Sequence, residues 1–185
     1  LFICGSTHPG EEELLLDSYC WVRQIFPELF LIIAPRDTNR AESIQALGNE
    51  RGLHAALKSN SKTVTRDLFI LDTIGELIDF YALSDIAFVG GSLVRKGGHN
   101  PIEPAAMGVP VLFGDDMEDF SEIAAMLIDE GGAIQVNSQE ELTEQLTLLV
   151  RDCELRQRYG EAAQNCIAGQ RGVIGRHLEL IQRLM

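Results

Sequence analysis

The chain has 185 residues, 45% of them hydrophobic, which suffices for one globular domain with a substantial core. Its formal net charge of −13 argues against a general nucleic-acid or anionic-membrane surface, because both need clustered Lys and Arg. Any anionic ligand must therefore be held locally.

In the first part of the chain, apolar runs alternate with amphipathic segments. Apolar runs predict strands at 1–4, 30–34 and 68–71 and a weaker one at 53–58. Helices are predicted from Glu11 to about Phe26, at 40–50 and at 75–83; in the first of these Leu15, Tyr19, Val22 and Phe26 form one apolar stripe. The polar segment 59–67 is predicted to be a surface loop.

The rest of the chain repeats this alternation and ends in helices. Strands are predicted at 86–89, 111–113 and 133–136, with helices after Asn100 and around 120–127. Three helical segments follow, one around Leu142 to Leu149, one at 153–168 and one from Ile174 to Met185. The alternation predicts an α/β fold with a parallel sheet covered on both faces, whose ligands bind beyond the carboxyl ends of the strands.

A glycine-rich stretch, FVGGSLVRKGGHNPIEPAAMGVP at 88–110, joins a strand to a helix. Asn100 is a good N-cap, Pro101 suits the first helical position, and Glu103 either completes a capping box or binds a ligand. Glycines permit a close backbone approach, and free amides at a helix start attract anions. The stretch therefore predicts a phosphate or nucleotide cradle, formed by Gly90, Gly91, Gly97, Gly98 and the helix start, with Arg95 and Lys96 supplying positive charge.

Other loops that follow strands offer competing or supporting groups. Glu11, Glu12 and Glu13 would repel a phosphate at the first helix, so the helix after Asn100 is the better anion site. Ser6 and Thr7 are expected to donate hydroxyl hydrogen bonds from the rim of the site, and His8 is either a ligand contact or an ordinary loop histidine. Arg36 lies at the mouth of the sheet, where it either meets a ligand or pairs with Asp37. No zinc spacing, GxSxG elbow or Walker loop is found.

The four cysteines, Cys4, Cys20, Cys153 and Cys166, show no CxxC spacing and lie in apolar patterns. They are expected to be buried thiols without disulfides, in a reducing compartment. The chain begins inside a strand-like run, without a signal peptide or a long apolar segment, so it is interpreted as the C-terminal piece of a longer protein.

Several motifs, in order along the chain, resemble one family. They are GSTHPGEE at 5–12, PR at 35–36 with Arg40 behind it, DTIGEL at 72–77, and GGSLVRKGGHNPIEPAAMGVPVLFG at 90–114. Together they are similar to 3-deoxy-D-manno-octulosonic acid (Kdo) transferase. The resemblance covers the C-terminal, nucleotide-binding half of this GT-B glycosyltransferase, in which two Rossmann-like domains face a cleft.

The resemblance implies a binding site for the donor CMP-Kdo within residues 1–185, treated as a single Rossmann-like domain. The implied nucleotide-binding residues are Ser6, Pro35, Arg36, Ile74, Gly75, Gly91, Ser92, Gly98, Asn100 and Glu103. Arg36 would meet the nucleotide, Ile74 and Gly75 would lie beside the base, and Asn100 and Glu103 would reach the phosphate and ribose. No catalytic residue is expected here, because the family's general base lies in the N-terminal half, and no metal or cofactor is expected.

The implied function is transfer of Kdo from CMP-Kdo to a lipid A precursor in lipopolysaccharide biosynthesis, at the cytoplasmic face of the bacterial inner membrane. This chain alone is expected to be soluble and to bind CMP without transferring Kdo. The acceptor and the membrane would be met by the missing half, toward which the helices at about 152–185 are expected to pack. No nucleic acid partner is expected.

Four positions depart from the family pattern: Asp37 replaces a histidine, Arg95 and Lys96 replace a more apolar pair, and Asp119 replaces an asparagine. The alternatives to Kdo transferase are another GT-B nucleotide-sugar transferase, using UDP- or GDP-sugars, a nucleotide-sugar epimerase, and a non-catalytic nucleotide-binding module. A dinucleotide-binding domain is disfavoured because GSTHPG is not GxGxxG.

Overall fold

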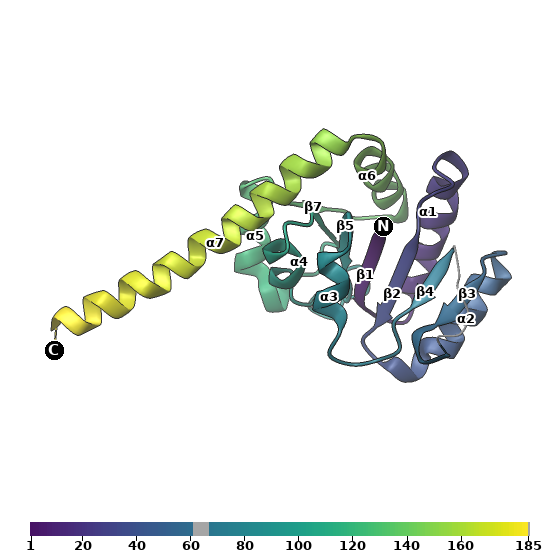
Figure 1. Cartoon of the computed structure of the whole chain (residues 1–185), viewed down its shortest axis with the longest axis horizontal. Coiled ribbons are helices and arrows are strands. Elements are labelled where there is room, and N and C mark those ends of the chain that lie inside the picture. The colour runs from purple at the N-terminus through teal and green to yellow at the C-terminus, as the bar shows by residue number, and fades with distance from the viewer. Residues whose placement is uncertain (61–66, 185) are drawn as a thin grey trace.

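The computed structural model describes residues 1–60 and 67–184, with side chains described up to residue 169. Seven parallel strands form one sheet in the order β3-β4-β2-β1-β5-β6-β7 (Figure 1). The predicted α/β fold with a parallel sheet is confirmed. The strands are β1 (Phe2–Thr7), β2 (Leu31–Pro35), β3 (Ala55–Leu57), β4 (Leu68–Ile70), β5 (Ile86–Val89), β6 (Val111–Phe113) and β7 (Ala133–Gln135).

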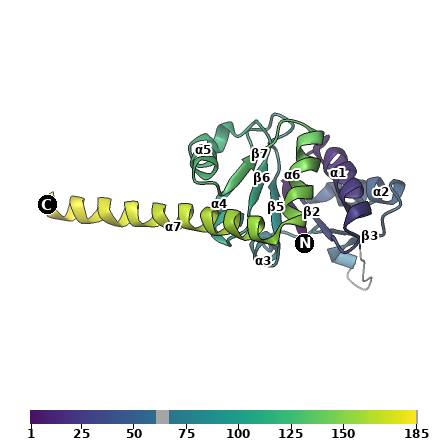
Figure 2. The same ribbon diagram turned by 90° about the horizontal axis from the view of Figure 1, so that it is seen from above.

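Helices cover both faces of the sheet, because alternate strand residues point to opposite sides (Figure 2). Phe2, Cys4 and Phe88 face the core beneath α1, α2 and α6, whereas Ile3 and Ala87 face α3. Val89 and Phe113 face α4, α5 and α7. The helices are α1 (Glu11–Ile25), α2 (Ala41–Glu50), α3 (Leu77–Ala82), α4 (Ile102–Ala106), α5 (Ser121–Asp129), α6 (Gln139–Arg151) and α7 (Cys153–Leu184), with short 3-10 turns at Thr38–Arg40, Lys58–Asn60 and Glu118–Phe120.

The last helix differs from the sequence prediction. The segments predicted separately at 153–168 and from Ile174 onward form one continuous helix, α7, whose far end projects away from the sheet (Figure 1). Its first turns pack on α4 and the loop that follows: a Cβ at Gly160 would lie 2.1 Å from the Gly108 carbonyl oxygen. Glycine at 160 therefore permits this close approach. The expected contact of 152–185 with a missing domain stays a prediction.

The predicted surface loop at 59–67 ends in a buried acid, and residues 61–66 lie outside the described part of the chain. Asp67 is 4% exposed, accepts hydrogen bonds from the His54 amide (2.7 Å) and Nδ1 (2.9 Å), and pairs with Arg23. Burial acts to raise the pKa of Asp67, but the His54 hydrogen bonds and the Arg23 charge prevail and lower it. The loop therefore ends at a polar anchor that local composition did not reveal.

All four cysteines are free thiols. Cys4 and Cys166 are buried and Cys20 is partly buried, as their apolar surroundings predicted. Cys153 is exposed, and its expected burial was wrong because α7 begins there, at the surface. No helix in the described part of the chain combines the length and apolar character needed to cross a membrane.

Candidate functional site

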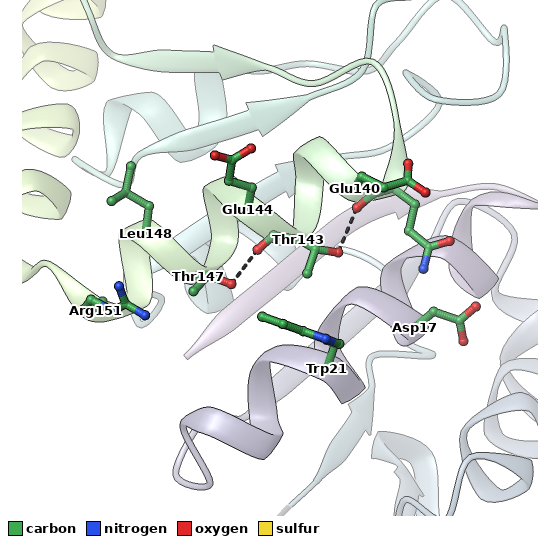
Figure 3. A pocket seen from close by; sticks show the side chains of 9 residues that line it. Asp17, Trp21, Glu140, Thr143, Glu144, Thr147, Leu148 and Arg151 are labelled. Carbon is green, nitrogen blue, oxygen red and sulfur yellow. Dashed lines mark hydrogen bonds between the residues drawn. The ribbon is translucent and has the colours of Figure 1, made fainter.

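The structure contains a surface groove of about 620 Å³ between α1 and α6 (Figure 3). Trp21 of α1 lies in it, 51% exposed, on the same side of α6 as Thr143 and Thr147, and Asp17 and Glu140 stand toward its other end. None of the ten residues predicted to bind nucleotide lines this groove. Size alone therefore does not locate the site that the motifs predict.

A smaller cavity, of about 130 Å³, opens where β1, β2 and β4 end. Parallel strands bring their carboxyl ends to one edge of a sheet, which is where ligands bind in such folds. The cavity brings together half of the residues that the motifs predicted, from three separate loops: Ser6, Pro35, Arg36, Ile74 and Gly75. Ala34, Thr38, Leu71, Thr73 and Leu77 complete its lining.

The backbone at the end of β1 turns sharply beside this cavity. Ser6 has a φ of 57°, a left-handed conformation that is uncommon for a residue with a side chain. The pairing of β1 with β2 shifts register between Gly5 and Thr7, and the Arg36 amide then donates to the Thr7 carbonyl (3.0 Å). This irregularity places Ser6 and Arg36 at the same cavity, on adjacent strands.

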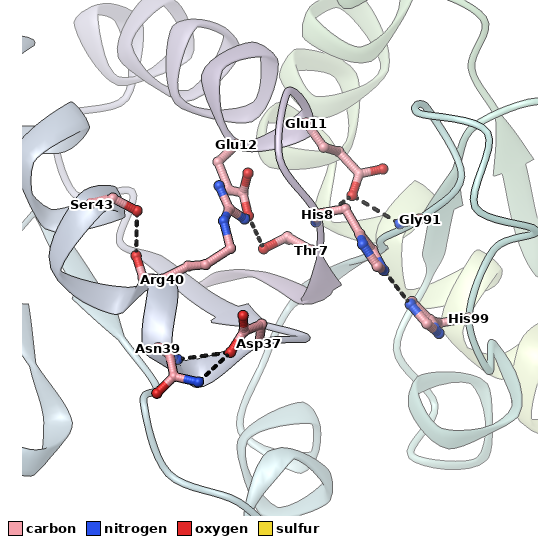
Figure 4. Close-up of polar contacts among 10 residues, drawn as sticks. All are labelled: Thr7, His8, Glu11, Glu12, Asp37, Asn39, Arg40, Ser43, Gly91 and His99. Atoms are coloured by element: carbon pink, nitrogen blue, oxygen red, sulfur yellow. Dashed lines mark hydrogen bonds and ion pairs between the residues drawn. The ribbon is translucent and has the colours of Figure 1, made fainter.

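Arg36 does not form the ion pair with Asp37 that was the alternative prediction. The Asp37 carboxylate instead accepts hydrogen bonds from the Asn39 amide (3.0 Å) and Nδ2 (2.8 Å), which caps a short 3-10 turn (Figure 4). Arg36 is exposed and forms no ion pair with any described residue. Its guanidinium is therefore available at the cavity mouth.

The helix whose start was predicted to bind an anion is α4. It is short, and its first turn is not capped by the predicted capping box. α4 has five residues and begins at Ile102, whose amide donates to Asn100 Oδ1 (3.0 Å). Asn100 Nδ2 donates to Glu103 Oε1 (3.3 Å), and no described backbone amide donates to Glu103. The reciprocal capping box is therefore absent among the described residues, and Glu103 is left partly buried with acceptor capacity to spare.

The amides of the glycine loop after β5 already hold an anion from within the chain. The fully buried Glu11 carboxylate accepts from the amides of His8 (3.2 Å) and Gly91 (2.8 Å), which Figure 4 draws. It also accepts from the amides of Ser92 (3.2 Å) and Leu93 (3.0 Å). Burial raises the pKa of Glu11, while the amide hydrogen bonds oppose that rise. Glu11 therefore occupies the Gly91 amide, which is one part of the predicted phosphate cradle.

Two further members of the predicted set have structural roles. The Ser92 side chain is fully buried, donates to the Val89 carbonyl (2.6 Å) and accepts from the Gly114 amide (2.7 Å), so it does not line a cleft. Gly98 donates to the Gly91 carbonyl (3.2 Å), and a Cβ there would lie 2.4 Å from Met117 Sδ. Ser92 therefore joins the glycine loop to the loop after β6, and Gly98 closes a turn within the glycine loop that packs closely against Met117.

Glu12, next to Glu11, is also fully buried but points to the other side of the β1 loop. Its Oε1 accepts from Thr7 Oγ1 (3.0 Å) and pairs with Arg40 (2.5 Å), as Figure 4 shows. The sequence predicted that this acidic turn repels a phosphate. In the structure, Glu11 and Glu12 are buried and connect α1 to the loops after β1, β2 and β5 by hydrogen bonds and an ion pair. Glu13 is partly exposed.

A histidine pair bridges the two halves of the predicted site. His8 Nε2 and His99 Nε2 lie 2.8 Å apart, with the rings nearly parallel (9°) and their centroids 5.0 Å apart (Figure 4). A Cβ at Gly91 would lie 3.1 Å from His99 Cδ2, so glycine there makes room for the ring. His8 was singled out from the sequence with two interpretations. His99 was not, although it stands directly before Asn100 in the GGHN motif.

Comparisons with known proteins identify the family of the chain. Residues 57–166 match the family "Glycosyl transferases group 1". The chain is 35% identical to the 3-deoxy-D-manno-octulosonic acid transferase of Haemophilus influenzae and 32% identical to that of Rickettsia conorii, in each case over 98% of the chain. It spans only 43% and 40% of those relatives' lengths.

A solved structure of similar fold also comes from a protein that binds CMP-Kdo. The crystal structure of the C-terminal CMP-Kdo binding domain of WaaA from Acinetobacter baumannii superposes with a TM-score of 0.84 and 25% identity, covering 90% of this chain and 88% of that one. The resemblance to Kdo transferase is confirmed, and so is the fold of a GT-B C-terminal domain. The chain therefore belongs to the group 1 family of glycosyl transferases.

Proposed function

We propose that this chain is the donor-binding domain of a Kdo transferase and binds the nucleotide of CMP-Kdo. The observation that carries the proposal is the cavity at the ends of β1, β2 and β4, which gathers five residues from three separate motifs. The relatives named as Kdo transferases and the CMP-Kdo binding domain of similar fold support the same donor.

The proposed contacts follow from the chemistry of a nucleoside monophosphate. The cavity of about 130 Å³ beside Ile74 and Gly75 receives the base. Arg36, exposed and without an ion pair among the described residues, meets the phosphate at the mouth. Glu103, to which no described backbone amide donates, accepts hydrogen bonds from the ribose hydroxyls.

In the reaction, CMP is the leaving group, and its phosphate carries more negative charge as the bond to the sugar breaks. A guanidinium held at the phosphate stabilises that charge in the transition state. Glu11 occupies the amides of Gly91, Ser92 and Leu93. Arg36 and Asn100 are therefore the groups proposed to bind the phosphate. In the full-length protein, the general base is proposed to come from the other half.

The wider activity is proposed from the family. The full-length protein would transfer Kdo to a lipid A precursor at the cytoplasmic face of the inner membrane, with acceptor and membrane contacts made outside this chain. The isolated chain is proposed to be soluble, to bind CMP and to transfer nothing. No metal is proposed, and no group of three His, Cys, Asp or Glu side chains suited to a metal ion occurs among the described residues.

Isothermal titration of the chain with CMP, UMP, UDP and NAD tests the proposal. CMP is expected to bind most tightly, and Arg36→Ala is expected to weaken that binding. Arg158→Ala, the same charge change on the exposed side of α7, is the matched control and is expected to bind CMP as the parent chain does. A marked preference for UDP would overturn the Kdo assignment, and tight NAD binding would overturn the glycosyltransferase donor role.

A further inference from the structure

The His8–His99 contact joins the two loops that carry the proposed site. His8 lies two residues after Ser6 in the loop after β1, and His99 directly precedes Asn100 in the loop before α4. Both rings are partly buried, and their Nε2 atoms lie 2.8 Å apart. The pair therefore connects the cavity side of the site with the side that carries Asn100 and Glu103.

Only some protonation states of the two rings keep the hydrogen bond between their Nε2 atoms. An N–H···N hydrogen bond needs one donor and one acceptor, so in the neutral state one Nε2 carries a hydrogen and the other does not. A first added proton goes to the free Nδ1 of the donor ring and keeps the bond, giving an imidazolium paired with an imidazole. A second added proton would place hydrogens on both Nε2 atoms and break it. The pair thus takes up one proton without rearrangement.

The charges around the pair decide whether it takes that proton. Lys96 of the glycine loop, Arg36 after β2 and Arg40 of the 3-10 turn disfavour a further positive charge, whereas Glu12 and Asp119 favour one. Burial is the largest influence and lowers the pKa of both histidines; Lys96, Arg36 and Arg40 add to this at His8, and Arg36 does so at His99. With no anion bound, the pair is therefore neutral near pH 7.

We infer that the His8–His99 pair is the proton-linked part of the anion site, and that it takes up one proton when the phosphate of a cytidine nucleotide binds beside it. The inference rests on the proposed function, since it needs an anion between Arg36 and Asn100. A bound phosphate offsets the repulsion from Arg36 and Lys96, so the imidazolium form becomes favourable. The new positive charge then adds to the hold on the phosphate.

Isothermal titration in buffers of different ionisation enthalpy measures this proton uptake directly. The ligand is cytidine 5′-methylphosphate, a phosphodiester whose phosphate does not titrate near neutral pH. At pH 6.5 to 7, the parent chain is expected to take up roughly 0.3–1 proton per ligand bound, a linkage that makes affinity rise as pH falls. His8→Gln and His99→Gln keep a hydrogen-bonding side chain but are expected to reduce the uptake to nearly zero.

His54→Gln is the matched control, because it removes an exposed histidine at β3 that faces Asp67. It is expected to leave the uptake unchanged, and thermal melts confirm that each variant is folded. Ligand binding with equal uptake in the parent and both His variants, or with none in the parent, would overturn this inference alone. Absence of binding by both this ligand and CMP would overturn the proposed function and the inference with it.

Discussion

Replacing Glu11 by alanine is expected to be among the more damaging single changes in this fold. The substitution removes the acceptor for four amides, those of His8, Gly91, Ser92 and Leu93, at 2.8 to 3.2 Å. Each orphaned buried amide costs roughly 1–3 kcal/mol. Water entering the space satisfies some of them, so the expected loss of unfolding free energy is about 3–5 kcal/mol, the scale for breaking a buried charged contact.

Thermal unfolding followed by circular dichroism is the assay. A loss of 3–5 kcal/mol lowers Tm by roughly 6–20 °C in a chain of this size. Glu42→Ala, which removes an exposed carboxylate from the first turn of α2, is the matched control and is expected to change stability by less than about 0.5 kcal/mol. Glu11→Gln should fall between the two, because its single oxygen accepts from only some of the amides. If Glu11→Ala melted like Glu42→Ala, the carboxylate would not organise the glycine loop.

Three further outcomes are expected. Glu103→Ala weakens CMP binding by roughly 1–3 kcal/mol with little change in Tm; a fall in Tm at unchanged affinity would show that Glu103 serves the helix. Arg36→Ala weakens CMP binding about tenfold or more, and equal affinity at low salt would refute the phosphate contact. The folded chain lowers the pKa of His8 and His99 below 6.5, so their contribution to stability is present above that pH and lost as pH falls below it. Melts at pH 7.5 and 5.5 should therefore differ less in His8→Gln than in the parent, and an equal difference would contradict this.

Much of the fold was predictable because strand and helix periods are local signals. The strands at 86–89 and 111–113 were predicted with the bounds that the structure shows, and the buried stripe of α1 contains Leu15, Tyr19 and Val22 as expected. The break predicted between 168 and 174 was wrong, because α7 continues through Gly169, where a Cβ would meet nothing within 4 Å, and an isolated glycine is tolerated in a helix.

Only part of the candidate site was predictable from the sequence. The meeting of Ser6, Arg36 and Gly75 followed from strand order, since the loops after parallel strands share one edge. The occupant of the glycine-loop amides did not, because Glu11 lies 80 residues away in sequence from Gly91 and reaches it only through the tertiary fold. From the sequence alone, Glu11 is an acidic residue in the first turn of a helix, and such a residue is expected to repel a phosphate.

His99 was missed for a similar reason. A lone histidine in a loop carries little information until its partner, His8, is placed beside it by the pairing of β1 with β5. Ser92 was assigned to the ligand because its motif resembles the family's, yet its buried hydroxyl joins the glycine loop to the loop after β6. A motif residue can therefore be needed for the shape of the site without touching the ligand.

The location of bound CMP tests the central claim most directly. In a titration followed by NMR of the backbone amides and the Trp21 indole, the largest shifts are expected at Arg36, Gly75, Asn100 and Glu103, around the ends of β1, β2, β4 and β5. Trp21, in the groove between α1 and α6, should be unaffected. Shifts concentrated at Trp21 and α6, with the residues around Arg36 unchanged, would contradict the proposed donor site.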